Sequence, residues 1–100
     1  MNQAKQSRIE FEAWEYILPA MQEIARVSAK SFAKYGPGNW ARVERKDNIN
    51  HALRHLCLYR DKIEGVPLPE GEGNENHLAH ACARLMMEIA KEGMHDENYC

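Results

Sequence analysis

The sequence predicts an all-α fold, a small bundle of about four helices that is completed by oligomerisation. Apolar residues recur every three or four positions through most of the 100-residue chain, which is the spacing of amphipathic helices. Runs rich in glycine and proline separate these segments. The length suits one domain, so residues 1–100 are expected to form one helical unit with flexible tails at 1–6 and 94–100. Two of the helical faces are rich in Ala, Met and Ser and bury little area, so we expect a second chain to complete the core.

The first helix is expected at residues 8–18. Ser7 and Glu10 fit a capping box, in which each side chain bonds a free backbone N–H of the first turn. Pro19 has no backbone N–H and disfavours helical geometry at the residue before it. We therefore expect a break there, with a second helix over residues 19–35.

The second helix is expected to end at Gly36, because glycine readily takes the left-handed conformation that closes a helix. Residues 40–47 are predicted to form an ordered, irregular loop. Asp47 or Asn48 then caps a third helix that runs to about Ile63.

A long loop is expected at residues 64–76, which hold two prolines and several glycines. A loop of this length in a small domain is usually either functional or disordered. Asn74 or Asn76 is expected to cap the last helix, which we expect to end at Gly93.

Composition excludes several classes of partner. Thirteen Lys and Arg against fifteen Asp and Glu give a net charge of −2, so duplex nucleic acid is not an expected partner. No apolar stretch approaches the roughly 18 residues that a membrane span needs, and the N-terminus lacks the apolar run of a signal peptide. Three widely spaced cysteines do not make a disulfide framework, which favours a reducing cytoplasm.

The first cluster that indicates a chemistry is the run KYGPGNWAR at residues 34–42. Two large aromatic side chains and two cations flank a Gly-Pro-Gly turn. Aromatic rings stack on bases, and Lys and Arg bind phosphate, so this run predicts a nucleotide contact. The alternative is a helix stop with its aromatic residues folded onto the core.

Histidines form the second cluster. His51 and His55 are four residues apart and share a helical face, and His77 and His80 lie three apart on the last helix. One interpretation is a transition-metal site made by all four imidazoles. The interpretation that we favour makes His55, His77 and His80 donors to phosphate or ribose, next to Arg54. A third makes His77 a polar residue of the helix start.

Carboxylates form the third cluster. Magnesium-dependent cleavage of a nucleotide needs several carboxylates around one ion. The pairs Glu12-x-x-Glu15 and Glu44-x-x-Asp47 fit the ExxE…ExxD spacing of all-α nucleotide pyrophosphatases. The second pair lies in the predicted irregular loop, so its side chains need not share a face. The alternative set of carboxylates is Glu23, Glu70, Glu72 and Glu75.

Four blocks of sequence together resemble a known family. They are residues 17–27 (ILPAMQEIARV), 34–40 (KYGPGNW), 52–56 (ALRHL) and 77–81 (HLAHA). Their order and spacing are similar to the phage-borne family described as the dATP/dGTP diphosphohydrolase N-terminal domain, over residues 17–89. The resemblance implies an all-helical fold, a purine nucleotide ligand and a phage protein acting in the bacterial cytoplasm.

Residues that stand where the family's shared motifs stand are Glu23, Lys34, Tyr35, Asn39, Trp40, Arg54, His55, His77 and His80. Two departures matter. The acidic approach to the HLAH block is altered to residues 70–74 (EGEGN), and Arg84 stands where the family often carries Asn. An added cation would repel a metal and would favour a bare phosphate.

These observations favour capture of a nucleotide without hydrolysis and without a cofactor. The ligand would be a purine nucleotide, or a cyclic or ADP-ribose-type second messenger of host defence, which the protein would sequester. The expected ligand-binding residues are Lys34, Tyr35, Asn39, Trp40, Arg42, Arg54, His55, His77, His80 and Arg84.

Two alternatives stay open. One is a magnesium-dependent dATP/dGTP diphosphohydrolase that releases pyrophosphate, in which Glu23, Glu70 and Glu72 hold the metal and are catalytic. The other is a helical adaptor with no small ligand.

Overall fold

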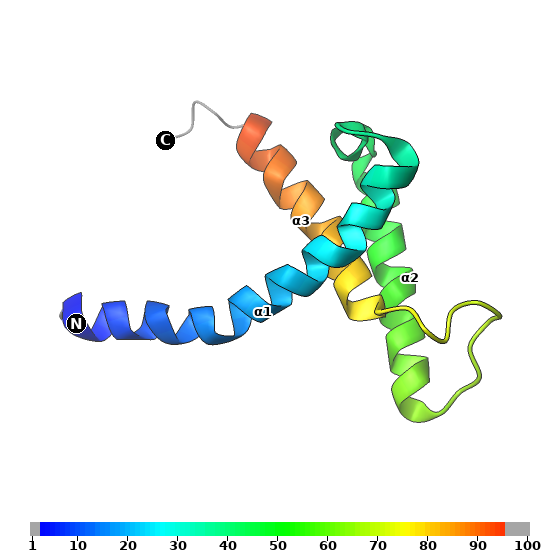
Figure 1. Ribbon diagram of the computed structural model, residues 1–100, viewed down its shortest axis with the longest axis horizontal. Coiled ribbons are helices and arrows are strands. Elements are labelled where there is room, and N and C mark those ends of the chain that lie inside the picture. Colours follow the sequence, from blue (N-terminus) through cyan, green and yellow to red (C-terminus); the bar gives the residue numbers. More distant parts are fainter. Residues whose placement is uncertain (1–2, 96–100) are drawn as a thin grey trace.

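A computed structural model describes residues 3–95 of the chain, and the elements within this range are all helical. They are α1 (Gln3–Tyr35), a 3-10 helix η1 (Asn39–Arg42), α2 (Arg45–Glu64) and α3 (His77–His95), as Figure 1 shows. The all-α prediction is confirmed. Three α-helices stand in place of the four that were expected.

The difference in number arises at Pro19, where the predicted break is wrong. Helix α1 continues through Pro19 as one ribbon of 33 residues (Figure 1). Pro19 is exposed, so water can satisfy the carbonyl left without a partner one turn earlier. Strong helix formers follow it at residues 20–23. The helix also begins before Ser7, which therefore does not cap it.

Helix α1 ends as predicted. Gly36 has a φ of 87°, and its N–H donates to the carbonyl of Phe32 at 2.9 Å. The predicted irregular loop is shorter than expected, because η1 and the start of α2 occupy much of it. The carbonyl of Glu44 accepts the N–H groups of Asp47 and Asn48 at 3.0 and 3.1 Å. Both residues lie inside α2, so the prediction that one of them caps this helix is wrong.

The long loop is confirmed between α2 and α3. Asn76 caps α3, since its Oδ1 accepts the N–H of Ala79 at 3.0 Å. The expected end at Gly93 is wrong, because α3 runs to His95. The predicted tails overlap the described residues at 3–6 and 94–95, which are helical, while residues 1–2 and 96–100 lie outside them.

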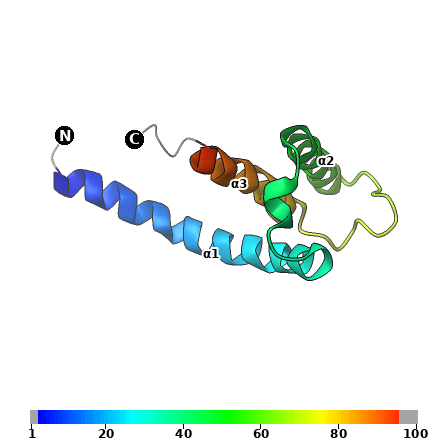
Figure 2. The same cartoon turned by 90° about the horizontal axis from the view of Figure 1, so that it is seen from above.

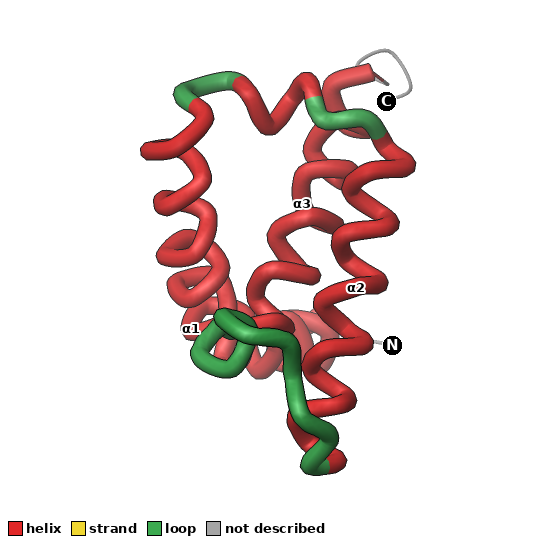
Figure 3. The backbone as a smooth tube through the Cα atoms, turned by 90° about the vertical axis from the view of Figure 1, so that its right-hand side faces the viewer, coloured by secondary structure: helices red, strands yellow, loops and turns green. Residues whose placement is uncertain are grey.

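Helix α3 is the central helix of the fold. It packs against both α1 and α2, and Figures 2 and 3 show it between them. The buried apolar core is small and is made mostly of alanine, which lets helices approach closely but removes little area from water. Its members are Val27, Ala52, Leu58, Ala79, Ala81 and Ala83.

The N-terminal part of α1 projects away from the other helices (Figures 1 and 2). The radius of gyration is 16.5 Å, against about 13 Å for a compact chain of this length. Trp14 and Leu18 lie on this segment with about half of their surface exposed. Within residues 3–95, no helix has the length and apolar character needed to cross a bilayer.

Oligomerisation stays a prediction. We expect sedimentation at micromolar concentration to show a species larger than one chain, because the small core and the exposed Trp14 and Leu18 leave apolar surface for a second copy. A monomer under these conditions would contradict the expectation.

Candidate functional site

Side chains from all three helices surround a cleft of about 350 Å³. Its lining residues come from α1, α2, the segment between α2 and α3, and α3. We call it the cationic cleft. Four cations line it: Lys30 and Lys34 from α1, Arg54 from α2 and Arg84 from α3.

The cleft collects most of the residues that the sequence predicted to bind a ligand. Six of them line it: Lys34, Tyr35, Arg54, His55, His80 and Arg84. Lys30 was missed, although it lies four residues before Lys34 and therefore shares its helical face.

A second, smaller pocket of about 200 Å³ adjoins the cationic cleft. Its lining includes Phe32, Tyr35, Asn39 and Trp40, and we call it the aromatic pocket. Tyr35 and Arg84 line both spaces, so the two are neighbours that share these side chains. The predicted contacts Asn39 and Trp40 are thus beside the cleft rather than in it. Arg42 is exposed on η1 and does not line either space.

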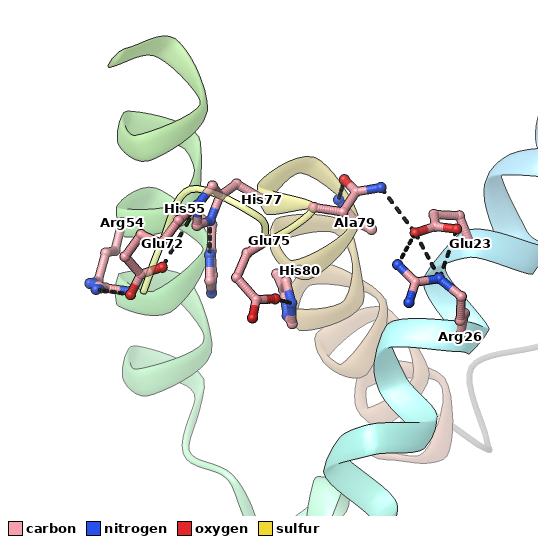
Figure 4. A network of polar contacts seen from close by, with 10 residues as sticks. Glu23, Arg26, Arg54, His55, Glu72, Glu75, His77, Ala79 and His80 are labelled. Atoms are coloured by element: carbon pink, nitrogen blue, oxygen red, sulfur yellow. Dashed lines mark hydrogen bonds and ion pairs between the residues drawn. The ribbon is translucent and has the colours of Figure 1, made fainter. Parts of the chain in front are cut away.

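Three histidines meet where α2 faces the start of α3 (Figure 4). Nδ1 of His55 lies 2.9 Å from Nδ1 of His77, and the ring of His80 stacks on that of His55 with centroids 4.8 Å apart. Nε2 of His77 lies 2.8 Å from the carbonyl oxygen of Glu72. His77 is only 1% exposed, so it reaches the cleft through His55 and does not itself line it.

Burial, followed by the nearby His80, His77 and Arg54, lowers the pKa of His55 to about 4. Glu72 acts in the opposite direction with a smaller effect. At pH 7 the imidazole of His55 is therefore neutral, and it offers one N–H and one lone pair.

This lowered pKa predicts a pH-dependent stability. Between pH 6.5 and 4 the unfolded chain binds a proton at His55 that the folded chain does not bind, so stability falls as the pH drops through this window. We expect a loss of about 1–2 kcal/mol after allowance for solvent screening. Thermal unfolding from pH 7 to 5 measures most of this loss, because that range lies above the ordinary glutamate pKa of 4.5, near which the unfolded chain protonates Glu23, Glu72 and Glu88.

A matched pair of variants checks the assignment to His55. His55→Asn should flatten the pH dependence, whereas His51→Asn, at an exposed position one turn earlier on α2, should preserve it. An equal slope in both variants and the parent chain would contradict the assignment.

The carboxylates of the cleft already have side-chain partners. Nη2 of Arg54 donates to Oε1 of Glu72 at 2.9 Å, and this bond holds the pKa of Glu72 below its ordinary value. Nε2 of His80 lies 3.0 Å from a carboxylate oxygen of Glu75. Both glutamates belong to the segment between α2 and α3.

Glu23 lies in a different cleft, which it lines with Arg26 and Asn76. Nε of Arg26 donates to Glu23 at 3.0 Å, and Nδ2 of Asn76 donates to it at 3.1 Å. Both bonds lower the pKa of Glu23, and the bond from Arg26 has the larger effect. Figure 4 shows Glu23 on the α1 side of the α3 start and Glu72 on the α2 side.

The carboxylates predicted to hold magnesium are therefore not brought together. Glu23 and Glu72 line different clefts, and Glu70 is exposed in the loop. In the part of the chain that the structure describes, no group of three or more His, Cys, Asp or Glu side chains is placed to hold a metal ion. The same finding applies to the four-histidine site, and His51 is exposed on α2.

A buried polar network that the sequence did not reveal positions Arg84. Asn48 is fully buried, its Oδ1 accepts from Nη1 of Arg84 at 3.2 Å, and its amide donates to Glu88. Lys91 pairs with Glu88 at 2.6 Å and also donates to the carbonyl of Val43. This network ties α2 to α3 and points a guanidinium at both the cleft and the aromatic pocket.

Comparison with known proteins gives a match to a family model. The family described as "dATP/dGTP diphosphohydrolase, N-terminal" matches residues 2–98. No curated protein matches the chain significantly, and no solved structure does so either. Since the match covers almost the whole sequence, the chain belongs to the family of dATP/dGTP diphosphohydrolase N-terminal domains.

Proposed function

We propose that the protein binds a purine nucleotide, with the phosphates in the cationic cleft and the base in the aromatic pocket. The observation that carries the proposal is the convergence of four cations from three helices on one cleft, next to an aromatic pocket that shares part of its lining. The cations are Lys30, Lys34, Arg54 and Arg84. Phosphate oxygens accept charge-assisted hydrogen bonds from such cations, and aromatic faces stack on bases. The family description names dATP and dGTP, which supports a purine deoxynucleotide.

Local charge, rather than net charge, supports an anionic ligand. The chain as a whole carries −2, but four cations line the cleft against the two carboxylates of Glu72 and Glu75. Half of the Arg54 side chain is exposed although Glu72 pairs with it. A phosphate can therefore replace Glu72 as the partner of Arg54 without first opening the core.

We propose that binding takes place without hydrolysis by this chain, because Glu23, Glu70 and Glu72 do not converge. Capture of the nucleotide is then the function. A magnesium-dependent diphosphohydrolase is the second candidate, and the family description favours it. That reaction would require the segment with Glu70 and Glu72 to move and Glu72 to leave Arg54.

Product analysis separates the two candidates. The protein is incubated with dGTP and magnesium, and the products are resolved by chromatography. Capture predicts a raised Tm with dGTP, which scales with ligand concentration over Kd, and no pyrophosphate. Release of pyrophosphate that disappears in Glu23→Ala would overturn capture. A panel of linear and cyclic purine nucleotides without any thermal shift would overturn nucleotide binding and favour the adaptor.

Trp40 tests the place of the base. We expect Trp40→Ala to weaken dGTP binding by about 1–3 kcal/mol, because an indole face that stacks on the base is lost. Calorimetric titration with dGTP and with inorganic triphosphate measures the effect. Triphosphate binding should not change, since it has no base, and an unchanged dGTP affinity would place the base elsewhere.

A further inference from the structure

Hydrogen-bonding rules assign the protons of the His55–His77 pair. Nε2 of His77 lies 2.8 Å from the carbonyl oxygen of Glu72. A carbonyl only accepts, so this Nε2 carries the hydrogen and neutral His77 has its lone pair at Nδ1. Nδ1 of His55 lies 2.9 Å from that lone pair and must carry the hydrogen of the contact. Neutral His55 is thus the Nδ1–H tautomer, with its lone pair at Nε2.

This lone pair is available to a ligand. Among the described residues, no side chain bonds Nε2 of His55, and no buried side-chain nitrogen or oxygen lacks a partner. Nε2 is therefore accessible, and His55 lines the cationic cleft. The ring is held on two sides, by the bond to His77 and by stacking on His80 at an interplanar angle of 15°.

The lone pair on Nε2 of His55 selects which part of a ligand can lie next to it. Lys30, Lys34, Arg54 and Arg84 present only donors to the cleft, whereas Nε2 of His55 presents only a lone pair. A phosphate oxygen cannot pair with it, because both atoms are acceptors. The partner must be a donor that lies beside the phosphates, and in a nucleotide a sugar hydroxyl meets this condition. The base is excluded, because His55 does not line the aromatic pocket.

We propose that Nε2 of His55 accepts a hydrogen bond from a sugar hydroxyl of the nucleotide whose phosphates occupy the cationic cleft, and that His77 is the positioning residue that fixes this tautomer. The inference rests on the proposed nucleotide-binding function. In a 2′-deoxynucleotide the hydroxyl is the one at the 3′ carbon, so the site selects linear nucleotides over 3′,5′-cyclic ones, which lack it.

The low pKa of His55 fits an acceptor rather than a general base. A value of about 4 leaves about one ring in a thousand protonated at pH 7, so the lone pair is present in nearly every molecule. The charged and titratable groups around the ring are His77 and His80 on α3, Arg54 beside it on α2, and Glu72 on the loop. Lys34 of α1 lines the same cleft.

The test compares two ligands of equal charge that differ in one hydroxyl. dGTP and 2′,3′-dideoxy-GTP are titrated calorimetrically into the protein in EDTA at pH 7.5, where magnesium-dependent hydrolysis cannot occur. We expect the dideoxy compound to bind about 2- to 13-fold more weakly, which corresponds to the loss of one neutral hydrogen bond. His55→Phe should reduce dGTP affinity to that of the dideoxy compound and leave the latter unchanged.

A second variant separates loss of the hydroxyl contact from loss of folding. His55→Phe leaves Nδ1 of buried His77 without its donor, so it can lose stability. The amide of His55→Gln can donate to His77 and present its oxygen to the cleft, and it should restore discrimination between the two ligands.

Failure of this inference differs from failure of the proposed function. Equal affinity of the parent protein for both ligands, with both weakened by Arg54→Ala, would overturn the hydroxyl contact and leave nucleotide binding intact. Absence of binding by either ligand would overturn both.

Discussion

Replacing Arg54 with alanine should weaken dGTP binding about 10- to 150-fold. The guanidinium supplies charge-assisted hydrogen bonds, each worth about 1.5–3 kcal/mol. The substitution also releases Glu72 from its 2.9 Å ion pair, so an unpaired carboxylate would remain in the cleft and repel the phosphates. Calorimetric titration in EDTA measures the loss.

Arg60→Ala is the matched control, because Arg60 is an exposed cation on the same helix that does not line the cationic cleft. The Arg60→Ala variant should bind dGTP with an affinity within about twofold of the parent protein, because exposed charges away from the ligand are screened by salt. Equal losses in both variants would show a general effect of charge. No loss in Arg54→Ala would place the phosphates elsewhere.

The second large effect is on stability. Asn48→Ala should lower the free energy of unfolding by about 2–3 kcal/mol, because it leaves Arg84 and Glu88 without their buried partner. Urea denaturation at a fixed protein concentration measures the change, with an unchanged m-value.

Asn50→Ala, two residues along α2 and exposed, should stay within about 0.5 kcal/mol of the parent chain. A similar loss at both positions would mean that the helix, and not the buried network, determines the effect. Asn48→Ala should also weaken dGTP binding, since Arg84 loses the contact that orients it.

The sequence predicted the helical elements well where local chemistry decides the structure. Gly36 and Asn76 end and begin helices as expected, because their conformational freedom and capping oxygen act within one turn. Pro19 was misread, since its cost of about 3 kcal/mol can be outweighed by the residues around it. A rule about proline alone does not include the favourable contributions of the neighbouring residues.

The site was predictable in its residue types and less so in its geometry. Lys34, Arg54 and His80 share a cleft, but this depends on how three helices are rotated against one another, which helical spacing alone does not determine. Burial is the property that the sequence did not reveal. His77 and Asn48 are among the most buried side chains, although asparagine is mostly exposed in proteins and histidine is of intermediate burial.

A crystal structure of the protein with dGTP tests the central claim most directly. We expect the phosphates between Lys34, Arg54 and Arg84, and the base against Trp40. The 3′ hydroxyl should lie within about 3.2 Å of Nε2 of His55, which is the upper limit for an ordinary hydrogen bond. Nucleotide density at any other surface, with no contact to the four cations of the cleft, would contradict the account.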